Sequence, residues 1–148
     1  MSLSKKIKIC DLGDVITGKT PSSKHPEDYG SDYLFITPSD DIDKKVVSQT
    51  SRGISKIGAD RQSKKILPPL SISVTCIGSA MGKVFMNATS SLTNQQINSI
   101  IVNEKKFDND YVYYLLKNNY QLLKNAAGGS TALPLLNKTS FEQLELTV

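Results

Sequence analysis

The chain contains 148 residues, of which 39% are hydrophobic and 22% are charged, and its formal net charge is +4 at pH 7. A chain of this length and apolar content fills about one hydrophobic core, so we expect a single domain over residues 5–148. The longest uncharged apolar stretch, Ile66–Ala80, is interrupted by prolines and is shorter than the roughly 20 residues of a membrane-spanning helix.

The cysteines and the N-terminal residues bear on the cellular compartment. Only two cysteines are present, Cys10 and Cys76, and their spacing does not match a disulfide framework. No charged and then apolar secretory segment follows Met1. We therefore expect a cytoplasmic protein without membrane contact, whose thiols pack as small hydrophobic groups.

Several short strands are predicted along the first two thirds of the chain. Each is a run of β-branched and apolar residues bounded by proline, glycine or asparagine. The two glycines of Gly78–Gly82 frame a connection typical of a hairpin. The predicted strands are Lys6–Leu12, Tyr33–Thr37, Leu70–Ile77, Lys83–Ala88 and Gln96–Val102.

One main helix is predicted over residues 108–127. Asp108 is a suitable N-cap, apolar residues then recur at helical spacing, and Gly128 and Gly129 end the pattern. A short helical turn is expected at Thr139 or Ser140, followed by a strand over Leu144–Val148. The fold class is therefore α+β, with a mixed α/β arrangement: an irregular mixed sheet of short strands, one main helix and smaller helical turns.

A phosphate-binding loop is suggested by Gly13–Thr20, which fits the pattern G-x-x-x-x-G-K-[ST]. In such a loop the lysine and hydroxyl residues begin a long helix. Pro21 and Pro26 follow closely here, and Ser22–Gly30 has no apolar helical periodicity. A P-loop-like nucleotide hydrolase is therefore the alternative that the surrounding sequence favours least.

Other catalytic patterns are also missing from the sequence. His25 is the only histidine and the two cysteines are distant from each other, so no zinc-ligand spacing can be assembled. A catalytic pair of cysteine or serine with histidine would have to use His25, which lies in a loop-like stretch between Lys24 and Pro26. The charged triplets Asp43–Lys45 and Glu104–Lys106 are typical of solvated loops. We expect no catalytic residue, no metal and no cofactor, and thus a binding protein that is not an enzyme.

Charge is unevenly distributed along the chain. Residues 27–43 contain six acidic and no basic side chains, whereas residues 52–65 contain five basic side chains and one aspartate. Lysines and arginines gathered in this way suit contact with a phosphate backbone, although a solvated protein face has the same composition. The candidate phosphate-contacting residues are Lys19, Lys24, Lys56, Lys64, Lys65 and Lys83.

The order of motifs resembles a known family. Asp11–Val15 and Gly18–Ser22 come first, and further matches follow over nearly the whole chain. This order is similar to the target-recognition domain of the specificity (S) subunit of type I restriction–modification enzymes. One departure is Pro69-Leu70, where the family usually has a small residue and glycine. The further matching segments are Leu34–Asp40, Ile66–Pro69, Ile77-Gly78, Gly82-Lys83, Asn94–Gln96, Tyr111–Leu116, Gly128–Thr131 and Leu136–Lys138.

The resemblance implies a sequence-specific DNA-binding module. Such a domain binds duplex DNA at one half of a bipartite target, while methyltransferase and restriction subunits modify and cleave. It also implies that the chain is half of a specificity subunit, without the connecting coiled-coil helix, and acts with a second recognition domain or a second copy. An alternative is a protein–protein interaction domain that uses the helix around Tyr111–Tyr120 to dock a partner helix or the methyltransferase subunit.

Base-reading candidates follow from side-chain chemistry. Glutamine and asparagine pair with adenine, and arginine pairs with guanine, through two hydrogen bonds each. Asn94 and Gln95 could equally satisfy buried backbone groups, so both interpretations stay open for them. Gly13, Gly18 and Gly128 are expected to serve backbone turns. The candidate base-reading residues are Gln62, Asn94 and Gln95 for adenine, and Arg52 and Arg61 for guanine.

Overall fold

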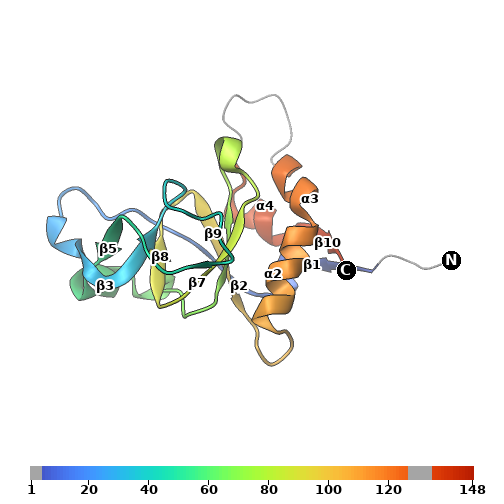
Figure 1. Ribbon diagram of the computed structural model, residues 1–148, viewed down its shortest axis with the longest axis horizontal. Helices are drawn as coiled ribbons and strands as arrows, with labels where there is room; N and C mark the ends of the chain where they lie inside the picture. Colours follow the sequence, from blue (N-terminus) through green and yellow to red (C-terminus); the bar gives the residue numbers. More distant parts are fainter. Residues whose placement is uncertain (1–4, 127–134) are drawn as a thin grey trace.

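The computed structural model describes residues 5–126 and 135–148, and its largest element is a five-stranded mixed sheet (Figure 1). Its neighbouring strands are antiparallel, except that β4 runs parallel to β7. The central strands β6 and β9 are almost entirely buried, which explains their runs of β-branched residues. In spatial order the strands are β2 (Gly13–Thr17), β9 (Ile97–Val102), β6 (Ile72–Thr75), β7 (Val84–Asn87) and β4 (Val46–Val47).

The predicted hairpin is confirmed, because β6 and β7 pair antiparallel with Ile72 opposite Met86. The connection includes the 3-10 turn Gly78–Ala80 and Gly82, whose φ of +91° lies in the left-handed region that favours glycine. The strand predicted at Lys6–Leu12 is shorter than expected. It consists of β1 (Lys6–Lys8) followed by the 3-10 turn Ile9–Asp11.

A second sheet forms the end of the molecule farthest from the chain termini, at the left of Figure 1. It contains β5 (Arg52–Ile54), β3 (Tyr29–Ile36) and β8 (Ser91–Thr93), with β3 antiparallel to β5 and parallel to β8. The 3-10 turn Pro26–Asp28 directly precedes β3, and helix α1 (Lys56–Arg61) follows β5. We call this part, residues 25–36 and 52–61 with β8, the distal end.

The opposite end carries the helices α2 (Asn109–Asn118), α3 (Tyr120–Asn125) and α4 (Lys138–Glu142). The Asp108 N-cap is confirmed, since its carboxylate accepts the Asp110 backbone N–H at 2.7 Å. The 108–127 helix is not continuous, however. Asn119 separates α2 from α3. Residue 127, the last of the predicted helix, and Gly128-Gly129 lie outside the described residues.

Asn119 breaks the helix because its side chain makes bonds elsewhere. Its amide nitrogen donates to the carbonyls of Leu115 and Thr147, and its amide oxygen accepts the Thr147 N–H. Thr147 belongs to β10 (Glu145–Thr147), which pairs antiparallel with β1. The helix break thus attaches the helices to the two-stranded sheet at this end, which we call the helical end.

Apolar packing is concentrated at the helical end. The largest cluster of buried side chains fills the space between the five-stranded sheet and the helices, and it includes Leu12, Val74, Leu116, Phe141 and Leu146. The distal end has a much smaller cluster of four buried residues, Phe35, Ile54, Ala59 and Leu92. The α+β class is confirmed, and among the described residues no helix is long and apolar enough to cross a membrane.

Candidate nucleic-acid interface

The segment that fits the phosphate-binding loop has a different structure. Residues Gly13–Thr17 form β2, and no α-helix begins at Lys19 or Thr20; the next helical element is the 3-10 turn Pro26–Asp28. The amides of Gly18 and Lys19 donate to the carbonyls of Ile97 and Thr93, at 3.2 and 2.9 Å, so they are not available to a nucleotide. The geometry of a nucleotide-binding loop is therefore not formed, and Gly18-Lys19-Thr20-Pro21 is a loop after a strand.

Gly18 allows this loop to lie directly on the turn between β8 and β9. A Cβ atom added at Gly18 would lie 2.2 Å from the carbonyl oxygens of Thr93 and Asn94. Such a distance excludes every other side chain unless the backbone moves. The loop and the turn are consequently packed as one unit, which brings residue 20 next to residue 95.

The turn between β8 and β9 presents Gln95 at its tip. The Asn94 side chain accepts the Gln96 N–H at 3.1 Å, and the Asn94 carbonyl accepts the Ile97 N–H at 3.3 Å. Asn94 is only 9% exposed, whereas Gln95 is exposed. For Asn94 the geometry favours support of the backbone, the second of the two interpretations that its sequence left open.

Thr20 contacts Gln95 from the adjacent loop. The Thr20 hydroxyl donates to the Gln95 side-chain oxygen at 2.6 Å. Within residues 5–126 and 135–148, the Gln95 amide nitrogen makes no hydrogen bond. The Gln95 carboxamide is thus held at one end and exposed to solvent at the other.

Three lysines from different parts of the chain gather beside this turn. Lys65 donates from its Nζ to the Thr17 carbonyl at 2.7 Å, and Lys19 lies two residues farther along that chain segment. Burial, followed by the charges of Lys138 and Lys19, lowers the pKa of the Lys65 ammonium group. We call Lys19, Lys65 and Lys138 the lysine triad.

Lys138 reaches the triad because α4 packs against β2. Asn98 on β9 links the two segments: its side chain accepts the Thr17 hydroxyl and donates to the Leu136 carbonyl. In the part of the chain that the structure describes, no carboxylate lies within ion-pair distance of any triad lysine. The triad is therefore a cluster of positive charge without an internal counterion.

Gln62 is buried and contacts the backbone of Lys19, one of the triad residues. Its amide nitrogen donates to the Lys19 carbonyl at 3.2 Å, while its amide oxygen has no partner among the described residues. Lys64, next in sequence but one, is exposed. The Gln62 geometry favours support of the Lys19 loop, and its role as a base reader stays a prediction.

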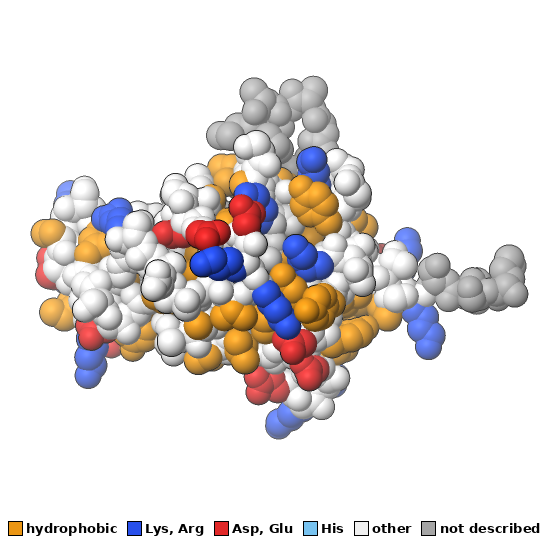
Figure 2. Space-filling model, viewed as in Figure 1, with side chains coloured by type: hydrophobic (Ala, Val, Ile, Leu, Met, Phe, Trp, Pro, Cys, Tyr) orange, Lys and Arg blue, Asp and Glu red, His pale blue; other side chains and the backbone are white. Residues whose placement is uncertain are grey.

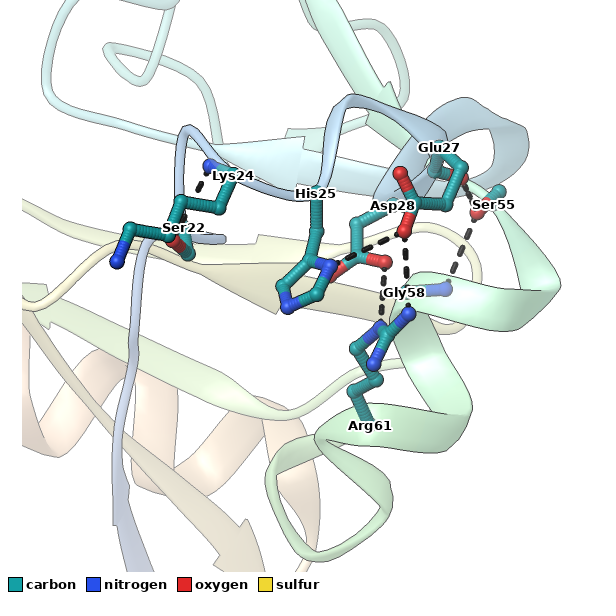
Figure 3. Close-up of polar contacts among 8 residues, drawn as sticks. All are labelled: Ser22, Lys24, His25, Glu27, Asp28, Ser55, Gly58 and Arg61. Atoms are coloured by element: carbon teal, nitrogen blue, oxygen red, sulfur yellow. Dashed lines mark hydrogen bonds and ion pairs between the residues drawn. The ribbon is translucent and has the colours of Figure 1, made fainter.

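Arg61 is engaged by two carboxylates at the distal end (Figure 3). Its Nε donates to Asp28 at 2.8 Å and its terminal nitrogen donates to Glu27 at 3.1 Å. Asp28 is 3% exposed. Ser55 extends this network, since its hydroxyl donates to the Glu27 carbonyl and accepts the Gly58 N–H. Arg61 therefore stabilises the junction between α1 and the turn before β3.

The Glu27 carboxylate also contacts His25, the only histidine of the chain. His25 lies 3.1 Å from Glu27, on the same side of the turn as Arg61 in Figure 3. A backbone hydrogen bond, with smaller contributions from His25 and Arg61, lowers the pKa of the Glu27 carboxyl. Arg61, Asp28 and Glu27 thus form a closed network, in which the guanidinium charge already has carboxylate partners.

The remaining predicted residues are dispersed. Arg52 stacks on the Tyr29 ring, with its guanidinium carbon 3.8 Å from the ring centre. Lys83 pairs with Asp43 at 3.0 Å, and these two residues precede β7 and β4, the strands at the opposite edge of the sheet from β2. Lys24 and Lys56 are exposed on the loop after β2 and at the start of α1. The base-reading and phosphate-binding roles of these residues stay predictions.

The structure therefore unites Lys19, Lys65, Gln62 and Gln95 from the predicted set, and it adds two residues that were not singled out. Lys138 belongs to the matched motif Leu136–Lys138, but nothing in its local sequence indicates that α4 lies beside β2. Thr20 lies within the phosphate-loop pattern, which pointed to different chemistry. Among the described residues no group of three histidine, cysteine, aspartate or glutamate side chains could hold a metal ion.

Known proteins are similar to this chain in sequence and in fold. The model of the family described as "Type I restriction modification DNA specificity domain" matches residues 1–148. The chain therefore belongs to this family of type I restriction–modification specificity domains. The resemblance inferred from the order of motifs is thereby confirmed.

Two curated relatives are similar over almost the whole chain. The HindI specificity subunit of Haemophilus influenzae is 41% identical over 140 residues, which cover 93% of this chain and 30% of that protein. The MjaIX specificity subunit of Methanocaldococcus jannaschii is 33% identical over 146 residues, covering 96% and 33%. The chain therefore spans about a third of the length of these relatives.

Solved structures confirm the fold at lower sequence identity. The type I restriction–modification S subunit from M. genitalium superposes with a TM-score of 0.67 at 17% identity, covering 97% of this chain and 34% of that one. The HsdS subunit from Thermoanaerobacter tengcongensis superposes with a TM-score of 0.68 at 12% identity, covering 97% and 32%. In both cases the superposition covers about a third of a longer chain.

Proposed function

We propose that this domain binds duplex DNA and recognises one half of a bipartite target, without catalysing a reaction itself. The observation that carries the proposal is the lysine triad, which has no internal counterion and lies beside the exposed amide of Gln95. Lysines neutralise backbone phosphates and provide affinity, whereas a glutamine amide can distinguish one base from another. The family assignment and the names of the relatives support the same function.

Partner subunits would perform the chemistry in this proposal. A methyltransferase subunit would modify the target and a restriction subunit would cleave DNA, while a second recognition domain or a second copy of this chain would contact the other half-site. Because the proposed ligand is DNA, we expect the domain to act in the cytoplasm. The proteins that the chain resembles are named specificity subunits, which fits a role in target choice.

A domain graft tests the proposal directly. Residues Lys6–Val148 replace the corresponding domain of a related specificity subunit, and the hybrid is assembled with its methyltransferase subunit. Sequencing of methylated bases genome-wide should then show a new half-site, while the half-site read by the other domain is kept. A hybrid that assembles and methylates only the host's original sequence would show that this domain does not select DNA.

Helix α2 supports a second role, in docking a partner. Tyr111 and Tyr114 are 44% and 52% exposed, and Figure 2 shows lysine side chains among hydrophobic ones over α2 and α3. The Lys45 ammonium lies 4.9 Å from the Tyr114 ring centre and pairs with Asp110. Exposed tyrosines next to a cation are frequent at protein interfaces.

The graft separates this docking role from DNA recognition. If α2 contacts the methyltransferase subunit or a helix of the specificity subunit, then Tyr111→Ser combined with Tyr114→Ser weakens assembly of the hybrid. The half-site that it methylates should stay the same. An unchanged elution profile of the complex in size-exclusion chromatography would argue against a contact at this face.

A further inference from the structure

The turn that carries Gln95 is rigid before any ligand binds. Its tip is fixed from within by the hydrogen bonds of Asn94 to Gln96 and Ile97. It is also fixed from outside, because the loop at Gly18 packs against the carbonyls of Thr93 and Asn94. A side chain on such a support loses little conformational freedom on binding, which is the property expected of a group that selects one ligand over another.

Thr20 restrains the Gln95 side chain through one hydrogen bond. The 2.6 Å hydrogen bond from the Thr20 hydroxyl occupies one acceptor site of the Gln95 oxygen and leaves a second acceptor site and two N–H donors. One acceptor and one donor, side by side on a planar group, match N6 and N7 of adenine in the major groove. Thr20 itself need not touch DNA to have this effect.

The lysine triad is positioned to bind the backbone beside that base. Lys65 is anchored on the Thr17 carbonyl, three residues before Thr20, so the cluster and the Gln95 amide share one support. Burial, and then the charges of Lys138 and Lys19, lower the pKa of Lys65 in the free protein, and a phosphate bound next to the three ammonium groups would relieve their mutual repulsion. Arg61 and Lys83 differ from these lysines, since carboxylates already neutralise them.

We propose that Thr20 is a positioning residue which holds the Gln95 carboxamide toward one adenine of the target, and that Lys138 joins Lys19 and Lys65 in binding the phosphate backbone next to that base. This inference rests on the proposed function of the domain. It assigns roles to Thr20 and Lys138, and it assigns the reading of one base position to a single hydrogen-bonded pair from two loops.

The first test substitutes Thr20 in the hybrid specificity subunit with Thr20→Val and Thr20→Ser. Valine keeps the shape and removes the hydroxyl, whereas serine keeps the hydroxyl. Methylation of a duplex library randomised over the new half-site then reports the preference at each position. Gln95→Ala should reduce the preference for adenine at one position by about tenfold. Thr20→Val should reduce the same preference several-fold, and Thr20→Ser should restore it.

The outcomes separate positioning from structure and from the proposed function. Thr20→Val with unchanged preference at every position would overturn the role of Thr20, and so would an equal loss at all positions that follows a lowered melting temperature. If the unsubstituted hybrid already fails to select a new half-site, the proposed function fails, and this inference fails with it. If the hybrid selects a new half-site but Gln95→Ala is silent, only the inference fails.

The second test measures the salt dependence of DNA binding by the hybrid methyltransferase complex. Lys138→Gln should lower the slope of log affinity against log salt concentration by about one unit, because each phosphate contact contributes roughly 0.9. Lys44→Gln is the matched control, since it removes the same charge from a lysine that is paired with Asp41. An unchanged slope for Lys138→Gln, or an equal change for Lys44→Gln, would overturn the assignment of Lys138.

Discussion

The distal end and the helical end of this domain are stabilised in different ways, and the difference explains which charged residues are free to bind a ligand. The helical end contains the large apolar core, in which Phe141 and Leu116 are completely buried. The distal end has only four residues in its apolar cluster, and it relies in addition on the network around Arg61.

This difference has a consequence for function. Where apolar burial already supplies the stability, surface cations need not form ion pairs with the protein's own carboxylates, and the lysine triad lies against α4 and β2 at the edge of the large core. At the distal end, where the core is small, Arg61 and Arg52 are used internally, whereas Lys56 is exposed. Arg61 and Arg52 are consequently weaker candidates for DNA contact than the lysines of the triad.

The largest effect is expected at the helical end. Phe141→Ala removes a fully buried ring between α4 and the sheet and should lower the free energy of unfolding by about 4 kcal/mol, within the range for aromatic truncation in a core. Urea denaturation followed by circular dichroism measures this loss. A cost below that of the Arg61 substitution described next would contradict the comparison of the two ends.

A smaller but still large effect is expected for Arg61→Met at the distal end. This change keeps the apolar stem and leaves the buried Asp28 carboxylate without its cation, which should cost about 2–3 kcal/mol. Lys64→Met is the control, because Lys64 is exposed, and it should change stability by less than about 0.5 kcal/mol. Equal effects of the two substitutions would show that the network contributes nothing.

A residue with a strained backbone lies just before β6, where its carbonyl accepts a hydrogen bond from Asn109 of α2. Leu70 precedes β6, next to α2, and has a φ of +65°, a left-handed conformation that costs a non-glycine residue about 1 kcal/mol or more. Leu70→Gly should therefore be more stable than Leu70→Ala by about 1 kcal/mol, as thermal unfolding of both variants can show. A glycine variant that is less stable than the alanine variant would contradict the left-handed conformation of residue 70.

Much of the fold could be predicted from the sequence because the signals were local. The β-branched runs at residues 72–75 and 97–102 and the cap at Asp108 depend on near neighbours, and all were confirmed. Helix α1 was missed, since its six residues have no apolar periodicity and its Gly58 packs on the Asp28 backbone. The break at Asn119 was missed too, because its cause is a contact with β10.

The candidate site was less predictable because charge pairing is decided by distant residues. Arg61 and Lys65 belong to the same basic segment, yet Arg61 meets Glu27 and Asp28 whereas Lys65 meets the Thr17 carbonyl. Nothing local in residues 52–65 distinguishes these two outcomes. Lys138 is farther still along the chain, and only the packing of α4 on β2 brings it to the triad.

The smallest effect concerns pH and tests whether the distal end depends on its ion network. The pKa of Glu27 is lowered in the folded protein, so its contribution to stability is present above the ordinary value of 4.5 and is lost as pH falls through the lower folded value. Glu27→Gln should therefore be less stable than the unsubstituted chain at neutral pH, and the difference should disappear in acid. Hydrogen exchange can place the effect, with amides of α1 and β5 losing protection on acidification before those of β6 and β9. Simultaneous loss at both ends would mean that the domain unfolds as one unit and that the Glu27 network has no separate role.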